Sequence, residues 1–262
     1  MTYQPILPAS GLVGWKFLER TFEAQSTAFQ SSSVLARDTA YFEQNIAKVD
    51  TAADLVSDRR LLRVALGAFG LEDDLNSRFF VRKILEEGTI DPGSLANKMS
   101  DSRYAALSDA FGFDLGVPRT KLSDFAGEII GQYRARQFEV AVGEQDQAMR
   151  LALNAQRELP EIAASDDSEN TRWYQIMGNA PLRSVMETAL GLPDSFAQID
   201  LDQQLEVFAE KAERQLGIDS LSDLSDPATL NKLIERYLLR AEARSGVGSS
   251  PASIALTLLQ SG

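Results

Sequence analysis

The 262-residue sequence contains no cysteine and no histidine. These absences exclude disulfides, thiolate nucleophiles, metal sites built on cysteine or histidine, and catalytic triads with an imidazole base. Chemistry based on carboxylate, lysine, tyrosine or serine side chains needs none of the missing residues. The composition therefore removes most familiar hydrolase mechanisms and leaves only a small set of others.

Basic residues are scarce beside acidic ones: 26 Lys and Arg stand against 38 Asp and Glu, which gives a formal net charge of -12. Such a protein repels phosphate backbones and anionic headgroups, so we expect no nucleic-acid partner. No apolar run reaches the roughly 20 residues that cross a bilayer, and the start does not read as a secretory signal. We expect a cytoplasmic protein without an integral membrane segment, although export by a dedicated apparatus stays open.

The spacing of apolar residues predicts the fold class. They recur at steps of three, four and seven residues along most of the chain, and no segment shows sustained alternation with period two. We therefore predict an all-α multi-helix bundle without a significant sheet. Near the start, the bulky stripe is formed by Leu12, Trp15, Leu18, Phe22 and Phe29.

Capping signals place several helix ends. "TAAD" at Thr51 has the spacing of a capping box, and Asp58 is a candidate N-cap for "RRLLRVALGAFG", which Gly70 ends. In "DPGSLANKM", Asp91 precedes a proline suited to a first helical turn, so we predict Asp91 as the cap of a short helix. Between these two helices lies another that Gly88 closes, with its apolar residues predicted to face inward: Leu75, Phe79, Phe80, Ile84 and Leu85.

The second half of the sequence suggests a division into two regions. Residues 121–157 are predicted to form one long helix that completes an N-terminal region, 1–157. The acidic stretch 158–170 is the best candidate for a linker. A C-terminal helical region, 171–262, follows and contains a glycine- and serine-rich joint at 245–251.

Two short stretches echo each other: "DPGSLANKMSDSRY" begins at Asp91 and "DPATLNKLIERY" begins at Asp226. Gly70 and Gly191, each followed by leucine, also match, but they are 121 residues apart whereas Asp91 and Asp226 are 135 apart. The second copy would therefore contain 14 inserted residues. Two related helical halves would explain the echo, and so would the punctuation that all helical proteins share. Under either interpretation the matched residues belong to the scaffold.

No recognised catalytic, cofactor or metal motif is present. The sequence has no phosphate-binding loop and no G-x-G-x-x-G between a strand and a helix. "DLDQQLEVF" at Asp200 lacks the glycine and the terminal glutamate of a calcium loop, and "SDDSE" at Ser165 is better explained as an acidic linker. We therefore predict no catalytic residue, no cofactor and no metal.

One region resembles a known family. Residues 11–113, and above all "DRRLLRVALGAFGLEDD" and "FFVRKILEEG", resemble an alphaproteobacterial family known as a domain of unknown function. Its members are often encoded among flagellar genes and are called flagellar proteins. The resemblance implies a process, motility, and supplies no catalytic residue. The partners that it implies are flagellar components, and the location is then flagellum-associated if the chain is exported.

The leading hypothesis is a non-enzymatic helical protein that supports flagellar structure or assembly through protein–protein contacts. An alternative is a cytoplasmic flagellar export chaperone or regulator, and another is a carboxylate-dependent enzyme acting on cell wall or a small metabolite. The oligomeric state is left open. The candidate contact residues comprise an aromatic stripe, two arginines on one helical face and an apolar C-terminal stretch: Trp15, Leu18 and Phe22; Arg78 and Arg82; Ile254, Leu256, Leu258 and Leu259.

Overall fold

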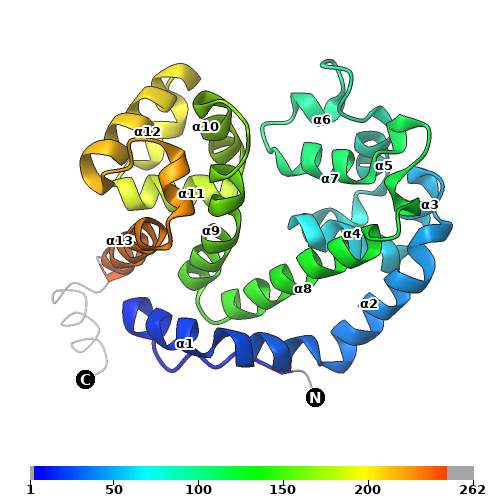
Figure 1. The fold of residues 1–262 in the computed structure, drawn as a ribbon, viewed down its shortest axis with the longest axis horizontal. Helices are drawn as coiled ribbons and strands as arrows, with labels where there is room; N and C mark the ends of the chain where they lie inside the picture. Colours follow the sequence, from blue (N-terminus) through cyan, green and yellow to red (C-terminus); the bar gives the residue numbers. More distant parts are fainter. Residues whose placement is uncertain (1–2, 247–262) are drawn as a thin grey trace, which may run out of the picture. The chain divides into compact units, whose positions relative to one another are not determined.

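The computed structural model describes residues 3–246 of the chain, and within them it contains thirteen α-helices, six short 3-10 helices and no strand (Figure 1). The all-α prediction is confirmed. Contacts divide the chain into two compact units: unit 1 is Met1–Ile6 with Arg20–Val142, and unit 2 is Leu7–Glu19 with Gly143–Gly262. No helix of the described part is long and apolar enough to cross a membrane.

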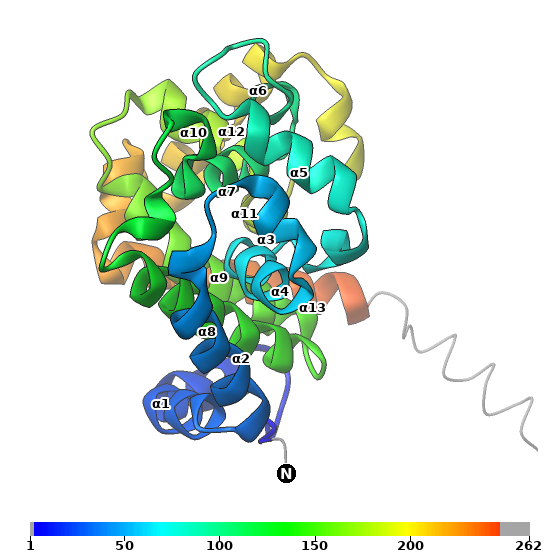
Figure 2. The same ribbon diagram turned by 90° about the vertical axis from the view of Figure 1, so that its right-hand side faces the viewer.

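Unit 1 is built around α4, whose interior residues are almost all buried. It packs against α2, α3 and α7, and α3 packs in turn against α5, as the neighbouring positions of α3 and α4 and of α3 and α5 in Figure 2 illustrate. The helices of this part of the chain are α1 (Gly11–Gln30), α2 (Ser33–Asn45), α3 (Ala52–Ser57), α4 (Arg59–Phe69), α5 (Arg78–Glu87), α6 (Leu95–Lys98), α7 (Arg103–Phe111) and α8 (Phe125–Gly143). The connecting 3-10 helices are η1 (Ile46–Lys48), η2 (Glu72–Asn76), η3 (Phe113–Leu115) and η4 (Arg119–Lys121).

The predicted caps around α3 and α4 are confirmed. Thr51 and Asp54 form the capping box, in which each side chain accepts a hydrogen bond from the backbone N–H of the other residue. Asp58 accepts from the amides of Arg60 (2.9 Å) and Leu61 (3.2 Å), and Gly70 ends α4 in the left-handed conformation. These local bonds satisfy backbone groups that a helix leaves free at its ends.

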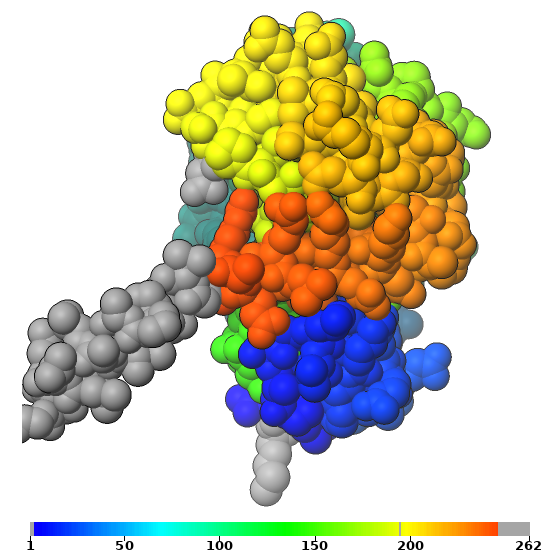
Figure 3. Space-filling model, turned by 90° about the vertical axis from the view of Figure 1, so that its left-hand side faces the viewer, coloured from blue at the N-terminus to red at the C-terminus, as the bar shows by residue number. Residues whose placement is uncertain are grey.

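Unit 2 is built around α11, which packs against α9, α10, α12 and α13. Its core includes three neighbouring aromatic rings, Trp173, Phe196 and Phe208. The first turns of α1 lie against α13 (Figure 3), where Lys16 and Glu235 form an ion pair at 2.8 Å. The elements are α9 (Gln147–Ala163), α10 (Glu169–Gly178), α11 (Ala180–Leu190), η5 (Asp194–Gln198), α12 (Leu201–Leu216), η6 (Leu221–Ser225) and α13 (Pro227–Gly246).

The predicted long helix over 121–157 is wrong. The chain forms two helices, α8 and α9, and the side chain of Asp146 caps the second by accepting from the amide of Met149 at 3.1 Å. The break allows α9 to approach Gly143, where a Cβ atom would collide with Arg150. The predicted linker at 158–170 is also wrong: its first half belongs to α9, and all of it lies inside unit 2.

Two further predictions about α5 and α6 need correction. Phe79 does not face inward but is 82% exposed, because Val81, Ile84 and Leu85 set the buried face of α5. Asp91 does not cap a helix. Ser94 caps α6, and Asp91 instead closes a turn by accepting from the amide of Gly93 at 2.8 Å.

The structure gives the two echoing stretches a common role. In unit 1, Arg103 donates to the backbone oxygen of Gly70 at the end of α4. In unit 2, Arg236 donates to the backbone oxygen of Ala189 at 2.8 Å, next to Gly191 at the end of α11. Each arginine thus satisfies carbonyl groups at the C-terminal end of a central helix. The prediction that the matched residues are scaffold fits these contacts.

The buried phenol of Tyr133 makes the stability of unit 1 depend on pH in the alkaline range. Burial, helped by the nearby charge of Asp38, raises the pKa of Tyr133 from 10.0 to about 12. The folded state therefore keeps a proton that the unfolded chain loses, and this contribution to stability is complete below pH 10 and is lost between pH 10 and about 12. The slope is at most about 1.4 kcal/mol per pH unit for a single group.

The Tyr133→Phe variant should lose stability less steeply than the wild type over this pH range, because it has no phenol to ionise at that position. Urea unfolding followed by far-UV circular dichroism at a series of pH values measures the difference. Equal slopes for the two proteins would contradict the prediction.

Candidate interaction surface

The outward face of α5 is the most exposed apolar feature on a helix of unit 1. Phe79 stands at its start with 82% of its surface exposed, while its neighbour Phe80 turns inward and meets the edge of Tyr104 at 5.2 Å between ring centroids. Adjacent residues on a helix point about 100° apart, so only one of two consecutive phenylalanines can join the core. Phe79 is the one left outside.

Two loops extend this face beyond the end of α5. Ile90 is 70% exposed, Leu115 is 48% exposed and Val117 is 72% exposed. Asp114 brings these loops together, because its carboxylate accepts from the amide of Thr89 at 3.3 Å. It also packs on Gly88, which has a φ of 69° and no room for a Cβ atom. We call Phe79, Ile90, Leu115 and Val117, with the exposed charges of α5, the α5 face.

Charged residues lie between the two apolar ends of the α5 face. Arg82 pairs with Glu86 at 2.6 Å, and Lys83 pairs with Glu87 at 3.6 Å, both at the four-residue spacing of one helical turn. All four side chains are partly exposed. Glu87 also accepts from the amide of Leu95 at 2.6 Å, which ties the start of α6 to the end of α5.

The candidates taken from the sequence fall in different places. Trp15 and Leu18 are buried inside the protein, at 1% and 0% exposure, so the structure contradicts their use as a contact surface. Phe22 is partly exposed, but its ring packs on Phe138 at 5.4 Å. These aromatic residues cover their own core, which is the usual fate of an apolar helical stripe.

The two arginine candidates lie on or beside the α5 face. Arg78 is exposed at the first position of α5, and Arg82 is exposed one turn later. The C-terminal candidates, Ile254, Leu256, Leu258 and Leu259, lie outside the described residues. Sequence reasoning missed Phe79, Ile90, Leu115 and Val117. The adjacent phenylalanines were the available signal, since one of them had to face away from the core.

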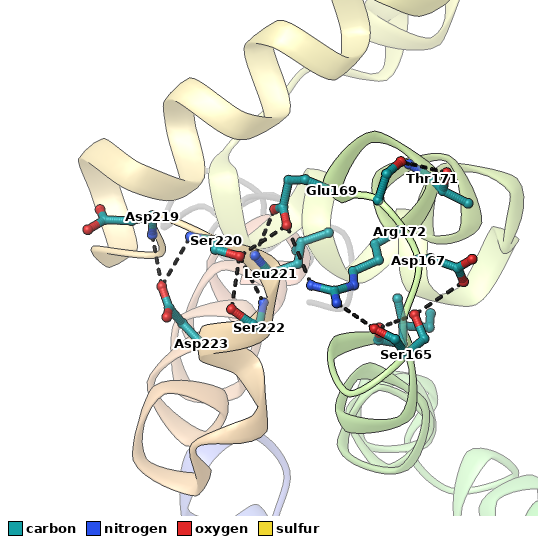
Figure 4. A network of polar contacts seen from close by, with 12 residues as sticks. Ser165, Asp167, Glu169, Thr171, Arg172, Asp219, Ser220, Leu221, Ser222 and Asp223 are labelled. Atoms are coloured by element: carbon teal, nitrogen blue, oxygen red, sulfur yellow. Dashed lines mark hydrogen bonds and ion pairs between the residues drawn. The ribbon is translucent and has the colours of Figure 1, made fainter.

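The acidic stretch near Ser165 takes part in a structural network rather than a ligand site (Figure 4). Glu169 accepts from the amide of Leu221 at 2.8 Å and from the hydroxyl of Ser220 at 3.0 Å, joining the start of α10 to η6. Arg172 pairs with Glu169 at 3.7 Å and donates to the backbone oxygen of Ser165. Within residues 3–246, no cluster of three or more carboxylates has the geometry of a metal site.

A buried carboxylate in unit 2 also escaped the sequence analysis. Glu158, on α9, accepts from the amide groups of Asn154 (3.1 Å) and Asn179 (2.7 Å) and from the guanidinium of Arg157 (3.1 Å). Asn179 in turn caps α11 by accepting from the amide of Leu182. Each of these contacts is intramolecular, so the group positions α9 against α11.

Comparisons with known proteins agree with this fold. The crystal structure of protein AGR_C_984 from Agrobacterium tumefaciens matches with a TM-score of 0.74 and 26% sequence identity, covering 92% of this chain and 99% of that chain. A search of curated proteins finds no match.

A family model, "Protein of unknown function (DUF1217)", matches residues 68–230. The match begins later than the resemblance noted from the sequence and continues well past Phe113, through most of unit 2. Neither similarity names the flagellum, so that part of the expectation stays a prediction. Because this family model matches more than half of the residues of the chain, the chain belongs to the DUF1217 family.

Proposed function

We propose that this chain is a non-enzymatic helical protein that supports flagellar structure or assembly through protein–protein contacts made by the α5 face. The observation that carries the proposal is the exposure of Phe79, with Ile90, Leu115 and Val117 on the adjoining loops. Water solvates exposed apolar side chains poorly, and apolar groups bordered by charged residues commonly mark interaction sites. The flagellar process comes from the resemblance of residues 11–113.

The chemistry around the patch also favours contact over catalysis. The charges of α5 are arranged as pairs on an open helical face, and partly exposed pairs suit the polar rim of an interface. The polar networks of unit 2 are occupied by bonds between helices. We therefore assign the working surface of the protein to apolar contact with a partner.

A complementation experiment tests the proposal. A strain lacking the gene is expected to swim poorly, and the wild-type gene is expected to restore swimming. Phe79→Asp should fail to restore it, because a buried carboxylate without a partner strongly opposes an apolar contact. The matched control is Val13→Asp, which places the same charge at another residue that is 76% exposed on a helix. The control should swim normally.

Capture with the tagged protein provides the second readout. Flagellar components should copurify with the wild type and with Val13→Asp and should be lost with Phe79→Asp. Recovery in purified basal bodies or in the exported fraction supports a structural role, whereas recovery in the cytosol alone favours an export chaperone or regulator. Normal swimming without the gene, together with no flagellar component in the capture, would sink the proposal.

A further inference from the structure

We propose that the α5 face is a self-association surface, through which two copies of this chain pair with their α5 helices antiparallel across a two-fold axis. The inference rests on the proposed function only in using the same face, and it names one partner of that face as a second copy. The argument comes from the order of the exposed residues along α5.

The exposed charges of α5 are segregated along the helix. The basic residues Arg82 and Lys83 come before the acidic residues Glu86 and Glu87, and all four lie on the face opposite the buried Val81, Ile84 and Leu85. A two-fold axis across the helix brings its beginning against the end of the second copy. Basic residues then meet acidic ones on both sides of the axis, so the face is complementary to itself.

The spacing selects one register. An axis between residues 84 and 85 sets Arg82 and Lys83 level with Glu86 and Glu87 of the second copy, because the two pairs lie equally far from the axis along α5. The helix ends at Glu87, and Gly88, with a φ of 69°, begins the loop that carries Ile90. The start of α5, with Phe79, then lies towards the end of α5 in the second copy, from which the Ile90 loop leaves. Phe79 and Ile90 are 82% and 70% exposed, so this arrangement brings the two apolar ends of the face towards each other.

The sides of the helix agree with this register. Arg82 and Glu86 share one side of the face and Lys83 and Glu87 share the other, as their four-residue spacing and ion pairs show. A two-fold axis keeps each side of a helix against the same side of its copy. Arg82 therefore meets Glu86 of the second copy, and Lys83 meets Glu87 of the second copy. A carboxylate accepts several hydrogen bonds, so each acid keeps its own helical partner as well.

The size of the surface predicts a weak dimer. Ten residues of helix are about 15 Å long and about 10 Å wide, so the face that α5 presents is well below the roughly 800 Å² that each partner buries in a standard interface. Leu115 and Val117, on the loop that Asp114 joins to Thr89, add exposed apolar surface near that end of the face. The net charge of -12 on each copy opposes association and is screened by salt. Dimers should therefore be seen at high protein concentration and at physiological ionic strength.

Sedimentation velocity of the purified full chain tests the dimer. The mass is expected to rise from that of one chain, 28.8 kDa, towards twice that value as the concentration increases to about 1 mM. Phe79→Glu should remain monomeric throughout. Arg82→Glu and Glu86→Arg should each weaken association about tenfold or more, because each sets two like charges against each other across the axis.

Mixing the two charge variants separates the antiparallel arrangement from a general loss of helix stability. Each substitution sets two like charges at positions 82 and 86 of the same helix, and mixing the two variants does not remove this repulsion within the helix. In an equimolar mixture, however, Glu introduced at position 82 meets Arg introduced at position 86 of the other chain, and the native pair forms on the far side of the axis. Association should then recover towards the wild-type strength. Circular dichroism confirms that each variant is folded.

A wild-type chain that stays monomeric up to about 1 mM overturns the inference. So does a dimer that Phe79→Glu leaves intact, or a mixture that recovers no association. The proposed function and the dimer fail by different results. If the chain does not self-associate but Phe79→Asp loses its captured partners, the α5 face contacts another protein and only the dimer is refuted.

Discussion

Replacing Phe208 with alanine is expected to lower the free energy of unfolding of unit 2 by about 3–5 kcal/mol. This side chain, in the middle of α12, is 0% exposed. Its ring lies 5.7 Å from that of Trp173 in a stacked arrangement and 5.1 Å from that of Phe196 in an edge-on one, measured between centroids. Truncation opens a cavity between the rings of Trp173 and Phe196, and these rigid rings can fill the cavity only in part. It also removes both aromatic contacts.

Tryptophan fluorescence measures this effect selectively. Trp15 and Trp173 are the two tryptophans of the chain, and both belong to unit 2. Urea titration of Phe208→Ala should show a fluorescence midpoint well below that of the wild type, with an unchanged slope. Leu239→Ala truncates a side chain of unit 2 that is 53% exposed and should change stability by less than about 0.5 kcal/mol. A loss below about 1 kcal/mol for Phe208→Ala would refute the prediction.

Local capping chemistry was the part of the fold that the sequence predicted best. Thr51, Asp58 and Gly70 each act through bonds to residues within four positions, so neighbouring letters of the sequence contain the information. A side-chain oxygen at the start of a helix and a glycine at its end have few alternatives. The helix between Asp58 and Gly70 could therefore be placed without knowledge of the rest of the protein.

Longer elements were predicted less well, because apolar spacing does not show where a helix is interrupted. The pattern through Tyr133, Val140, Met149 and Leu153 continues across the break between α8 and α9. The interruption depends on Asp146, whose side chain caps α9, and on the close approach of α9 to Gly143. The second of these is a tertiary contact and leaves no periodic signal.

The acidic stretch 158–170, which begins inside α9, shows the opposite error. Pro160 and several acidic residues suggested a linker, yet Pro160 lies within α9 and Glu158 is buried. Packing of Leu159 and Ala163 against the core keeps this turn helical although the proline supplies no backbone N–H. Tertiary burial outweighed a local preference here, and the composition of the stretch could not reveal it.

The α5 face was recognised only in part. Arg78 and Arg82 were identified from their shared helical face, but Phe79 was assigned to the core. Phe79 lies opposite the buried face that Val81, Ile84 and Leu85 set, whereas Phe80 lies nearer to that face and meets the ring of Tyr104 on a different helix. The exposed loop residues Ile90 and Leu115 are positioned by the bond between Thr89 and Asp114. Contacts between distant residues decide which apolar groups remain for a partner.

Removal of the Glu158 side chain is the second change with a large expected effect. Glu158→Ala should lower the free energy of unfolding of unit 2 by about 3–5 kcal/mol, the range seen when one member of a buried ionic group is lost. The amide groups of Asn154 and Asn179 would lose their acceptor in a region where both residues are buried. The side chain oxygen of Asn154 already has no partner, so rotation of that amide offers no relief.

Two further variants separate the loss of the acceptor from the loss of side-chain volume. Glu158→Gln keeps the shape and one acceptor oxygen but turns an N–H group towards a donor, so it should cost about 1–3 kcal/mol. Glu206→Ala removes an exposed glutamate of unit 2 and should change stability by less than about 0.5 kcal/mol. Tryptophan fluorescence during urea unfolding again isolates unit 2. If Glu158→Ala unfolds at the same urea concentration as Glu206→Ala, the carboxylate does not hold α9 against α11, because unpaired buried amides would have to lower the midpoint.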